Sequence, residues 1–236
     1  MLQRYSPREL LVLLAVLALF IYSFVGRSFF SPGRLYLIVG LLVGITVHEA
    51  CHALAAVQLG DPTPRLMGRL SLNPLRHLDP IGTFLILFGP FGWGKPVMFN
   101  PRNLRIDPAL GSSIVSVAGP VANVVTAFLA AQPLRAATDL DPTARSVLLA
   151  IVIANVFLAA FNLIPIPPLD GFGFVSGLLP KPIAYQLEPL RQYGPLLLMV
   201  LVFLPRFVPG APDILGSVMG PIANTLGRLI GTGRLL

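Results

Sequence analysis

The chain has 236 residues, of which 55% are hydrophobic and only 11% charged. This composition is too apolar for an ordinary soluble domain, and at this length it favours one integral membrane domain with an all-α polytopic fold. The net charge of +7 comes mostly from Arg in short loops between apolar runs, which indicates anionic lipid and excludes nucleic acid as the expected partner, since no basic helix or aromatic-basic stripe is present.

Apolar runs of membrane length predict about four to six transmembrane helices. The first run follows Arg4 and Arg8 without a clear cleavage site, so we interpret it as a retained span. Further along the chain, apolar residues recur at helical spacing over 213–230, which predicts an amphipathic helix on or against the membrane domain. The predicted spans are residues 10–25, 35–59, 112–132 and 146–164, with a fifth around 193–204 that is short unless it begins near residue 183.

Residues 60–110 differ from the spans because they are rich in Pro, Gly, Asn and Arg. Their one apolar stretch, 81–91, is too short for a helical span and is bounded by glycine and proline. We therefore predict a re-entrant or interfacial β-hairpin in this segment, with Trp93 near the headgroup level.

An H-E-x-x-H motif, made by His48, Glu49 and His52, lies inside the apolar run 36–59. Residues four apart share one helix face, so both imidazoles can reach one metal ion, with Glu49 beside them to activate a water molecule. A chance match with two polar core histidines is the alternative, but ionisable groups at mid-bilayer depth cost roughly 2.5–3.5 kcal/mol each and usually serve a function.

A catalytic zinc site commonly has three protein ligands, and Asp170 is the strong candidate for the third. It follows Pro165, Pro167 and Pro168, which stop the helix of the span 146–164. If residues 60–110 return to the side they left, that span runs parallel to the span of the motif. Asp170 then reaches the depth of His48. The alternative is a solvated turn acid before Gly171.

Four further residues are candidates for substrate binding. Asn123 and Asn162 lie near apolar spans and could bond the substrate backbone or the oxyanion, or simply tie helices together. Gly94 and Val97 lie in a possible strand edge, 92–97, to which an unwound substrate could add, although a purely structural hairpin is equally open. His77 lies in a turn-rich stretch and is expected to have a surface or loop-stabilising role.

Three motifs in order resemble the site-2 protease family of intramembrane zinc metalloproteases. They are the H-E-x-x-H run at 44–53, Ala-Gly-Pro-Val-Ala-Asn at 118–123 and the Leu-Asp-Gly run ending at Gly171. The resemblance spans roughly residues 35–175 and implies one zinc ion held by His48, His52 and Asp170, with Glu49 as general base and proton donor. It also implies single-pass membrane-protein substrates and a compact member without a PDZ or CBS domain.

These features predict a single intramembrane protease domain over residues 1–236. An extra N-terminal span occupies 1–33, the catalytic core occupies 35–175, and a C-terminal span and the amphipathic helix occupy 176–236. Two other functions stay open, a noncatalytic zinc-binding membrane scaffold and a metal transporter, and the sequence indicates no oligomeric state. We expect the membrane of a prokaryotic cell, with the active site nearer the cytoplasm, because the loop 60–110 has six Lys/Arg against Arg135 and Arg145 in the next loop.

Overall fold

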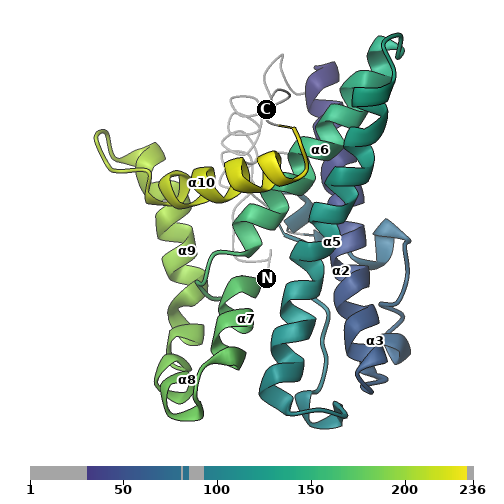
Figure 1. Cartoon of the computed structure of the whole chain (residues 1–236). Coiled ribbons are helices and arrows are strands. Elements are labelled where there is room, and N and C mark those ends of the chain that lie inside the picture. Colours follow the sequence, from purple (N-terminus) through teal and green to yellow (C-terminus); the bar gives the residue numbers. More distant parts are fainter. Residues whose placement is uncertain (1–30, 81, 85–92, 233–236) are drawn as a thin grey trace, which may run out of the picture.

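The computed structural model describes residues 31–80, 82–84 and 93–232 (Figure 1). Every named element in these ranges is helical, which agrees with the predicted all-α class. In chain order the elements are α2 (Pro32–Gln58), α3 (Thr63–Leu66), η2 (Pro74–Arg76), η3 (Pro101–Asn103), α5 (Pro108–Ala136), α6 (Pro142–Asn162), α7 (Asp170–Leu178), α8 (Lys181–Leu187), α9 (Leu190–Phe207) and α10 (Ile214–Leu229). The predicted span 10–25 lies outside the described residues.

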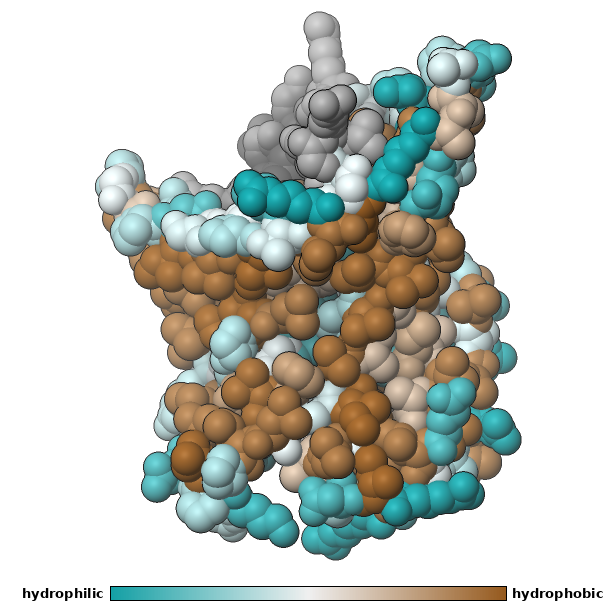
Figure 2. All heavy atoms as spheres, in the orientation of Figure 1, coloured by the Kyte–Doolittle hydropathy of each residue, from teal (hydrophilic) through white to brown (hydrophobic). Residues whose placement is uncertain are grey.

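Helices α2, α5 and α6 are each long and apolar enough to cross a membrane. Helices α8 and α9 pass the same test only as a pair and bend by 52° between them. The described part of the chain therefore holds three candidate spans, or four if the bent pair counts as one. Figure 2 shows an apolar belt on the face in view, with hydrophilic residues gathered toward both ends.

Two of the three spans start at an Asp-Pro pair. The Asp107 and Asp141 side chains each accept hydrogen bonds from two backbone N–H groups in the first turn, at 2.9–3.1 Å. The following prolines occupy the first helical position, where a missing N–H costs nothing. These local signals fix where α5 and α6 begin.

Small residues line the contacts among α2, α5 and α6, as is usual where transmembrane helices pack closely. A Cβ added at Gly40 would lie 2.5 Å from the backbone oxygen of Ala150, so α2 and α6 approach almost backbone to backbone there. This close packing lets short polar side chains on one helix reach the next. The alanines that are buried at 0–1% exposure in this bundle are Ala53, Ala56, Ala127, Ala131, Ala154, Ala159 and Ala160.

Helix α10 runs crosswise in the upper half of Figure 1, below the turn that joins α5 and α6, and contacts α6 and α9. Its residue Leu226 packs against a core cluster of α5 and α6, while Ile222 packs against a second cluster that includes Leu198 of α9. In Figure 2 its upper side is paler and more polar than the apolar surface below it. The predicted amphipathic helix is therefore present and packs against the candidate span α6 and against α9.

The described part of residues 60–110 does not support the predicted β-hairpin. Its only β-type pairing is an isolated bridge between Leu78 and Gly94. Backbone donors that would form a ladder instead bond carboxylates, because the Val97 N–H donates to Glu49 and the Asn100 N–H to Asp61. Pro96 adds a position with no donor at all, which also disfavours a strand.

A buried carboxylate, Asp61, holds the two ends of this segment together just after α2. It accepts hydrogen bonds from the N–H and Oγ1 of Thr63, from the N–H of Asn100 and from Nδ2 of Asn103, at 2.6–3.1 Å. Burial raises the pKa of Asp61, but these hydrogen bonds outweigh it and leave the pKa below its ordinary value. The ionised carboxylate is thus the form that the loop stabilises.

His77 is fully buried, so a surface position for this residue is wrong and the loop-stabilising role is the one observed. Its Nε2–H donates to the carbonyl of Ser71 at 2.7 Å, and its backbone oxygen accepts from the N–H of Lys95 at 2.7 Å. The buried guanidinium of Arg69 donates to the carbonyl of Arg76 in the same turn. These bonds hold one end of the 93–100 segment, while Asp61 holds the other.

Candidate metal centre

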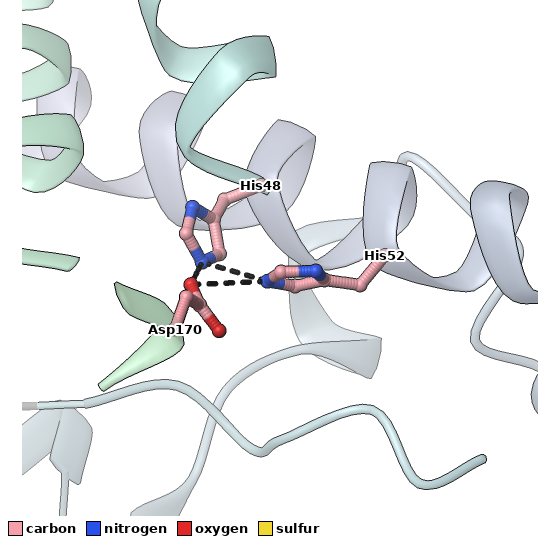
Figure 3. Close-up of side chains that lie close together, drawn as sticks. All are labelled: His48, His52 and Asp170. Atoms are coloured by element: carbon pink, nitrogen blue, oxygen red, sulfur yellow. Dashed lines mark hydrogen bonds and ion pairs between the residues drawn. The ribbon is translucent and has the colours of Figure 1, made fainter. Parts of the chain in front are cut away.

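Helix α2 presents His48 and His52 on one face, as their spacing predicts. Both side chains are buried, with residue exposures of 6% and 7%, and their rings meet edge to face. The two Nε2 atoms lie 3.0 Å apart (Figure 3). The two imidazoles of the motif therefore converge on one point.

Asp170 reaches the same point from α7, of which it is the first residue. Helix α7 packs tightly on α5 because its glycines leave no side chain in between; a Cβ added at Gly173 would lie 2.4 Å from Ser116 Oγ. Ser113 of α5 also donates to the carbonyl of Phe174 at 2.7 Å. This packing places Asp170 Oδ2 3.0 Å from His48 Nε2 and 3.3 Å from His52 Nε2 (Figure 3).

Hydrogen bonds behind the rings fix which nitrogen of each histidine faces the carboxylate. His48 Nδ1 lies 2.6 Å from Oδ1 of Asn123, and His52 Nδ1 lies 2.6 Å from the carbonyl oxygen of Val115. Both partners only accept hydrogen bonds, so each Nδ1 carries a hydrogen and donates it. In the neutral rings, both Nε2 atoms then present lone pairs toward Asp170.

Three lone-pair atoms therefore converge on one buried spot, and a metal cation suits it. A proton could join only one pair of them, whereas one cation satisfies all three. Within the described ranges, Asp170 Oδ2 is buried and has no hydrogen-bond partner. Zinc bonds of about 2.0–2.2 Å put tetrahedral ligand atoms about 3.3–3.6 Å apart, close to the separations of 3.0–3.3 Å here. The donor set of His48, His52 and Asp170, all within 4.8 Å, thus fits zinc.

Gly119 of α5 provides the space in which the two rings meet. A Cβ added at this position would lie 2.4 Å from His52 Nε2 and 2.6 Å and 2.7 Å from Cε1 and Nε2 of His48. No side chain fits there without moving a ligand atom. Gly119 therefore packs directly against the candidate ligand atoms of both histidines.

Glu49 is half-buried and lies against the 93–100 segment rather than in open space. The N–H of Val97 donates to its Oε2 at 3.1 Å, and a Cβ added at Gly94 would lie 3.7 Å from its Oε1. The same Cβ would be 2.8 Å from Ile45 Cγ2, so the backbone comes close to α2 at Gly94. The structure thus brings two of the predicted substrate-binding residues, Gly94 and Val97, beside the predicted base.

The two asparagines predicted to bind substrate occupy different surroundings. Asn123 is fully buried, and both ends of its amide have protein partners, so a substrate contact would require it to release one of them. Asn162 donates to the carbonyl of Leu158 in its own helix at 3.0 Å. For both residues, substrate binding stays a prediction.

Sequence reasoning missed Asn155, which is fully buried in α6 and bonds Asn123. An amide in the middle of an apolar span was the available signal, since polar groups at that depth usually have a role. Asp61 was missed as well, because two of its partners, Asn100 and Asn103, lie far from it in the sequence and no motif links them.

The fold and the site together define a helical protein with membrane-length helices and a candidate zinc centre of the H-E-x-x-H type. Over 178 residues the chain is 36% identical to "Putative zinc metalloprotease YwhC" of Bacillus subtilis (strain 168), covering 72% of this chain and 81% of that protein. It is 33% identical to "Putative zinc metalloprotease Rip2" of Mycolicibacterium smegmatis over 172 residues, and 33% identical to Rip2 of Mycobacterium tuberculosis (strain ATCC 25618 / H37Rv) over 177 residues. Each alignment covers 71% of this chain and 66% of that protein. The chain therefore belongs to the zinc metalloprotease family of YwhC. No protein-family model matches it, and no solved structure does.

Proposed function

We propose that the chain is an intramembrane zinc metalloendopeptidase of the site-2 protease type, which hydrolyses peptide bonds in or near transmembrane segments. The observation that carries the proposal is the convergence of His48, His52 and Asp170 on one buried spot among apolar helices. Membership of a family whose relatives are named zinc metalloproteases supports it. In this proposal the three residues hold one zinc ion.

When bound by such a set, zinc supplies a Lewis acid that polarises a peptide carbonyl and makes a water molecule more acidic. The residues of the chain do the rest. His48 and His52 are held by Asn123 and Val115, so their Nε2 atoms stay aimed at the centre without rearrangement. Such preorganisation lowers the reorganisation that the reaction would otherwise require.

Glu49 acts as the general base in this mechanism. It follows His48 directly on α2, and its carboxylate can take a proton from water and return it to the leaving amine. One of its oxygens, Oε2, already accepts from the Val97 N–H, which restricts how the carboxylate can turn. The other oxygen, Oε1, faces Gly94, where the absence of a side chain leaves the backbone close by.

The expected substrates are single-pass membrane proteins. A peptide bond in a transmembrane helix is covered by its own hydrogen bonds, so the enzyme must unwind the helix and offer its backbone new partners. The backbone of residues 94–97 lies next to the proposed base and is the surface that we assign to this role. Asn123 and Asn162 remain candidates for contacts with the substrate.

We further propose that the active site lies nearer the cytoplasmic face of a prokaryotic cell membrane. The segment between α2 and α5 carries six Lys/Arg, whereas the turn between α5 and α6 is flanked by two, Arg135 and Arg145. Cytoplasmic loops carry the excess of Lys/Arg, so the segment between α2 and α5 is assigned to the cytoplasm. Labelling of a cysteine introduced at Ser71 or at Asp139, in a Cys51→Ala background, tests this orientation in intact cells. We expect an impermeant reagent to label Asp139→Cys and not Ser71→Cys. The opposite labelling pattern would show that the proposed orientation is wrong.

The proposed function is tested by cleavage of a model single-span substrate by the purified protein and by Glu49→Gln, with zinc measured in both. Loss of the general base should reduce cleavage by about 10²–10⁴-fold while zinc content stays at one per chain. Glu188→Gln is a matched control, because Glu188 is exposed and forms an ion pair with the exposed Arg191. It should cleave like the wild type.

The other outcomes separate the remaining functions. Zinc in both proteins with no cleavage of any single-span substrate would favour a noncatalytic scaffold. Zinc that crosses vesicle membranes in the presence of the wild type would favour a transporter. A wild type that holds no zinc would refute the metal centre itself.

A further inference from the structure

A buried amide, Asn155, lies in the middle of the apolar helix α6 and takes no part in the mechanism above. It is 0% exposed and faces α2 and α5. Its Nδ2 donates to the carbonyl of Ile151 in its own helix at 2.9 Å. That bond fixes the orientation of the amide, so its Oδ1 is the atom turned toward Asn123.

Asn123 passes this orientation on to the metal centre. Its Nδ2 donates to Oδ1 of Asn155 at 2.8 Å and to the carbonyl of Gly44 at 3.0 Å. A flipped Asn123 would put its oxygen against these two acceptors, so the amide has one favourable orientation. Its Oδ1 is therefore the atom that faces His48 Nδ1, at 2.6 Å.

We infer that Asn155 is a positioning residue of the metal centre: through Asn123 it keeps the hydrogen of His48 on Nδ1, so that Nε2 binds the metal. The inference rests on the proposed zinc site. Partners behind metal-binding histidines typically contribute about 10–100-fold to metal affinity, and this chain places two amides in series there. Gly44 leaves room for the arrangement, since a Cβ at that position would lie 3.2 Å from Asn155 Oδ1.

A purely structural role, in which Asn155 only ties α6 to α5, predicts different behaviour. Loss of a helix tie lowers the free energy of unfolding but leaves the metal affinity of the folded protein unchanged. Loss of the orienting partner frees Asn123 to rotate and lowers the affinity for zinc. Metal binding by the folded protein therefore distinguishes the two roles.

The experiment compares zinc affinity, by chelator competition in detergent, for the full-length wild type, Asn155→Leu and Asn155→Asp. We expect Asn155→Leu to raise the Kd for zinc about 10–100-fold. Asn155→Asp should stay within a few-fold of the wild type, because either form of the carboxyl still accepts from Asn123. Thr126→Val is the matched control, since it removes a partly buried hydrogen bond within α5, from Thr126 Oγ1 to the carbonyl of Ala122, that does not involve the metal centre.

A second measurement needs no variant. The chain has only three histidines, so 15N-histidine labelling with 113Cd in place of zinc shows which nitrogen of each ring binds the metal. We expect cadmium coupling to Nε2 of His48 and a hydrogen on its Nδ1. Coordination through His48 Nδ1 in the wild type would overturn the inference even if Asn155→Leu failed to fold.

The inference would also be overturned if Asn155→Leu bound zinc as tightly as the wild type. The same holds if Thr126→Val lost as much zinc affinity as Asn155→Leu. The proposed function and this inference can fail separately. A wild type that binds zinc but cleaves nothing, with weaker zinc binding in Asn155→Leu, would refute the protease and support the positioning role. A wild type that cleaves its substrate, with unchanged zinc binding in Asn155→Leu, would support the protease and refute the positioning role.

Discussion

Replacement of Gly119 by alanine tests the geometry of the metal centre with a single methyl group. The new Cβ would lie 2.4 Å from His52 Nε2, whereas real contacts of this kind are essentially never below 3.0 Å. The ring or helix α5 must therefore move by about 0.6 Å, and metal-ligand distances tolerate only about 0.2 Å. We expect zinc affinity to fall by about 10–100-fold or more. A loss of 10–100-fold is typical when a residue that orients a metal ligand is mutated.

Stability should respond less than zinc binding in this variant. Alanine favours a helix interior over glycine by about 0.5–1 kcal/mol, while overpacking costs about 1–3 kcal/mol, so the net loss is small enough for the protein to fold. The assay is zinc Kd by chelator competition, together with thermal unfolding of the zinc-free protein. Gly220→Ala is the control, because an added Cβ there meets no atom of the described residues within 4 Å. Wild-type zinc affinity in Gly119→Ala would refute the assignment of this space to the ligands.

Three further predictions concern the surroundings of the site. Val97→Pro removes the N–H that donates to Glu49, so it should reduce cleavage while the zinc content is unchanged. Val97→Ala is the control because it keeps this N–H. Equal cleavage by the two variants would contradict the role of the donor. Asp170→Asn should lose stoichiometric zinc. A chelator should lower the melting temperature of the wild type but not that of Asp170→Asn. One zinc per chain in Asp170→Asn would show that this residue is not a ligand. Because the pKa of Asp61 is lowered on folding, its contribution to stability is complete above its unfolded value of 3.8 and is lost as pH falls through the lower folded value. Asp61→Asn should therefore lower the free energy of unfolding by about 1.5–3 kcal/mol at pH 7, with a smaller difference from the wild type near pH 3, and a difference that is constant with pH would contradict the ionised state.

The sequence by itself determined the parts of this protein that depend on local spacing. The offset of four residues between His48 and His52 places both imidazoles on one face of any α-helix, whatever surrounds it. Apolar run length and the Asp-Pro starts at Asp107 and Asp141 likewise gave helices close to the predicted spans. The meeting of Asp170 with the histidines followed from the direction of the spans, a topological argument that needs no side-chain detail.

Only the tertiary structure decided which polar groups serve the centre. The bonds from Asn155 through Asn123 to His48 join three helices, and they depend on how each helix is rotated and how closely it packs. No sequence period encodes that rotation. The space at Gly119 exists for the same reason, since it is defined by two rings from another helix.

The predicted hairpin is a case in which local sequence pattern gave a wrong prediction, because the hydrogen-bond partners are distant in the sequence. Turn-rich composition indicated a strand pair in residues 60–110, yet two carboxylates, Glu49 and Asp61, accept the backbone N–H groups of Val97 and Asn100. A backbone donor can bond an acceptor that is distant in the sequence but near in the folded chain, and here the two acceptors come from α2 and from the loop just after it. Local pattern fixed the helices and the motif, whereas long-range packing fixed the partners that orient them.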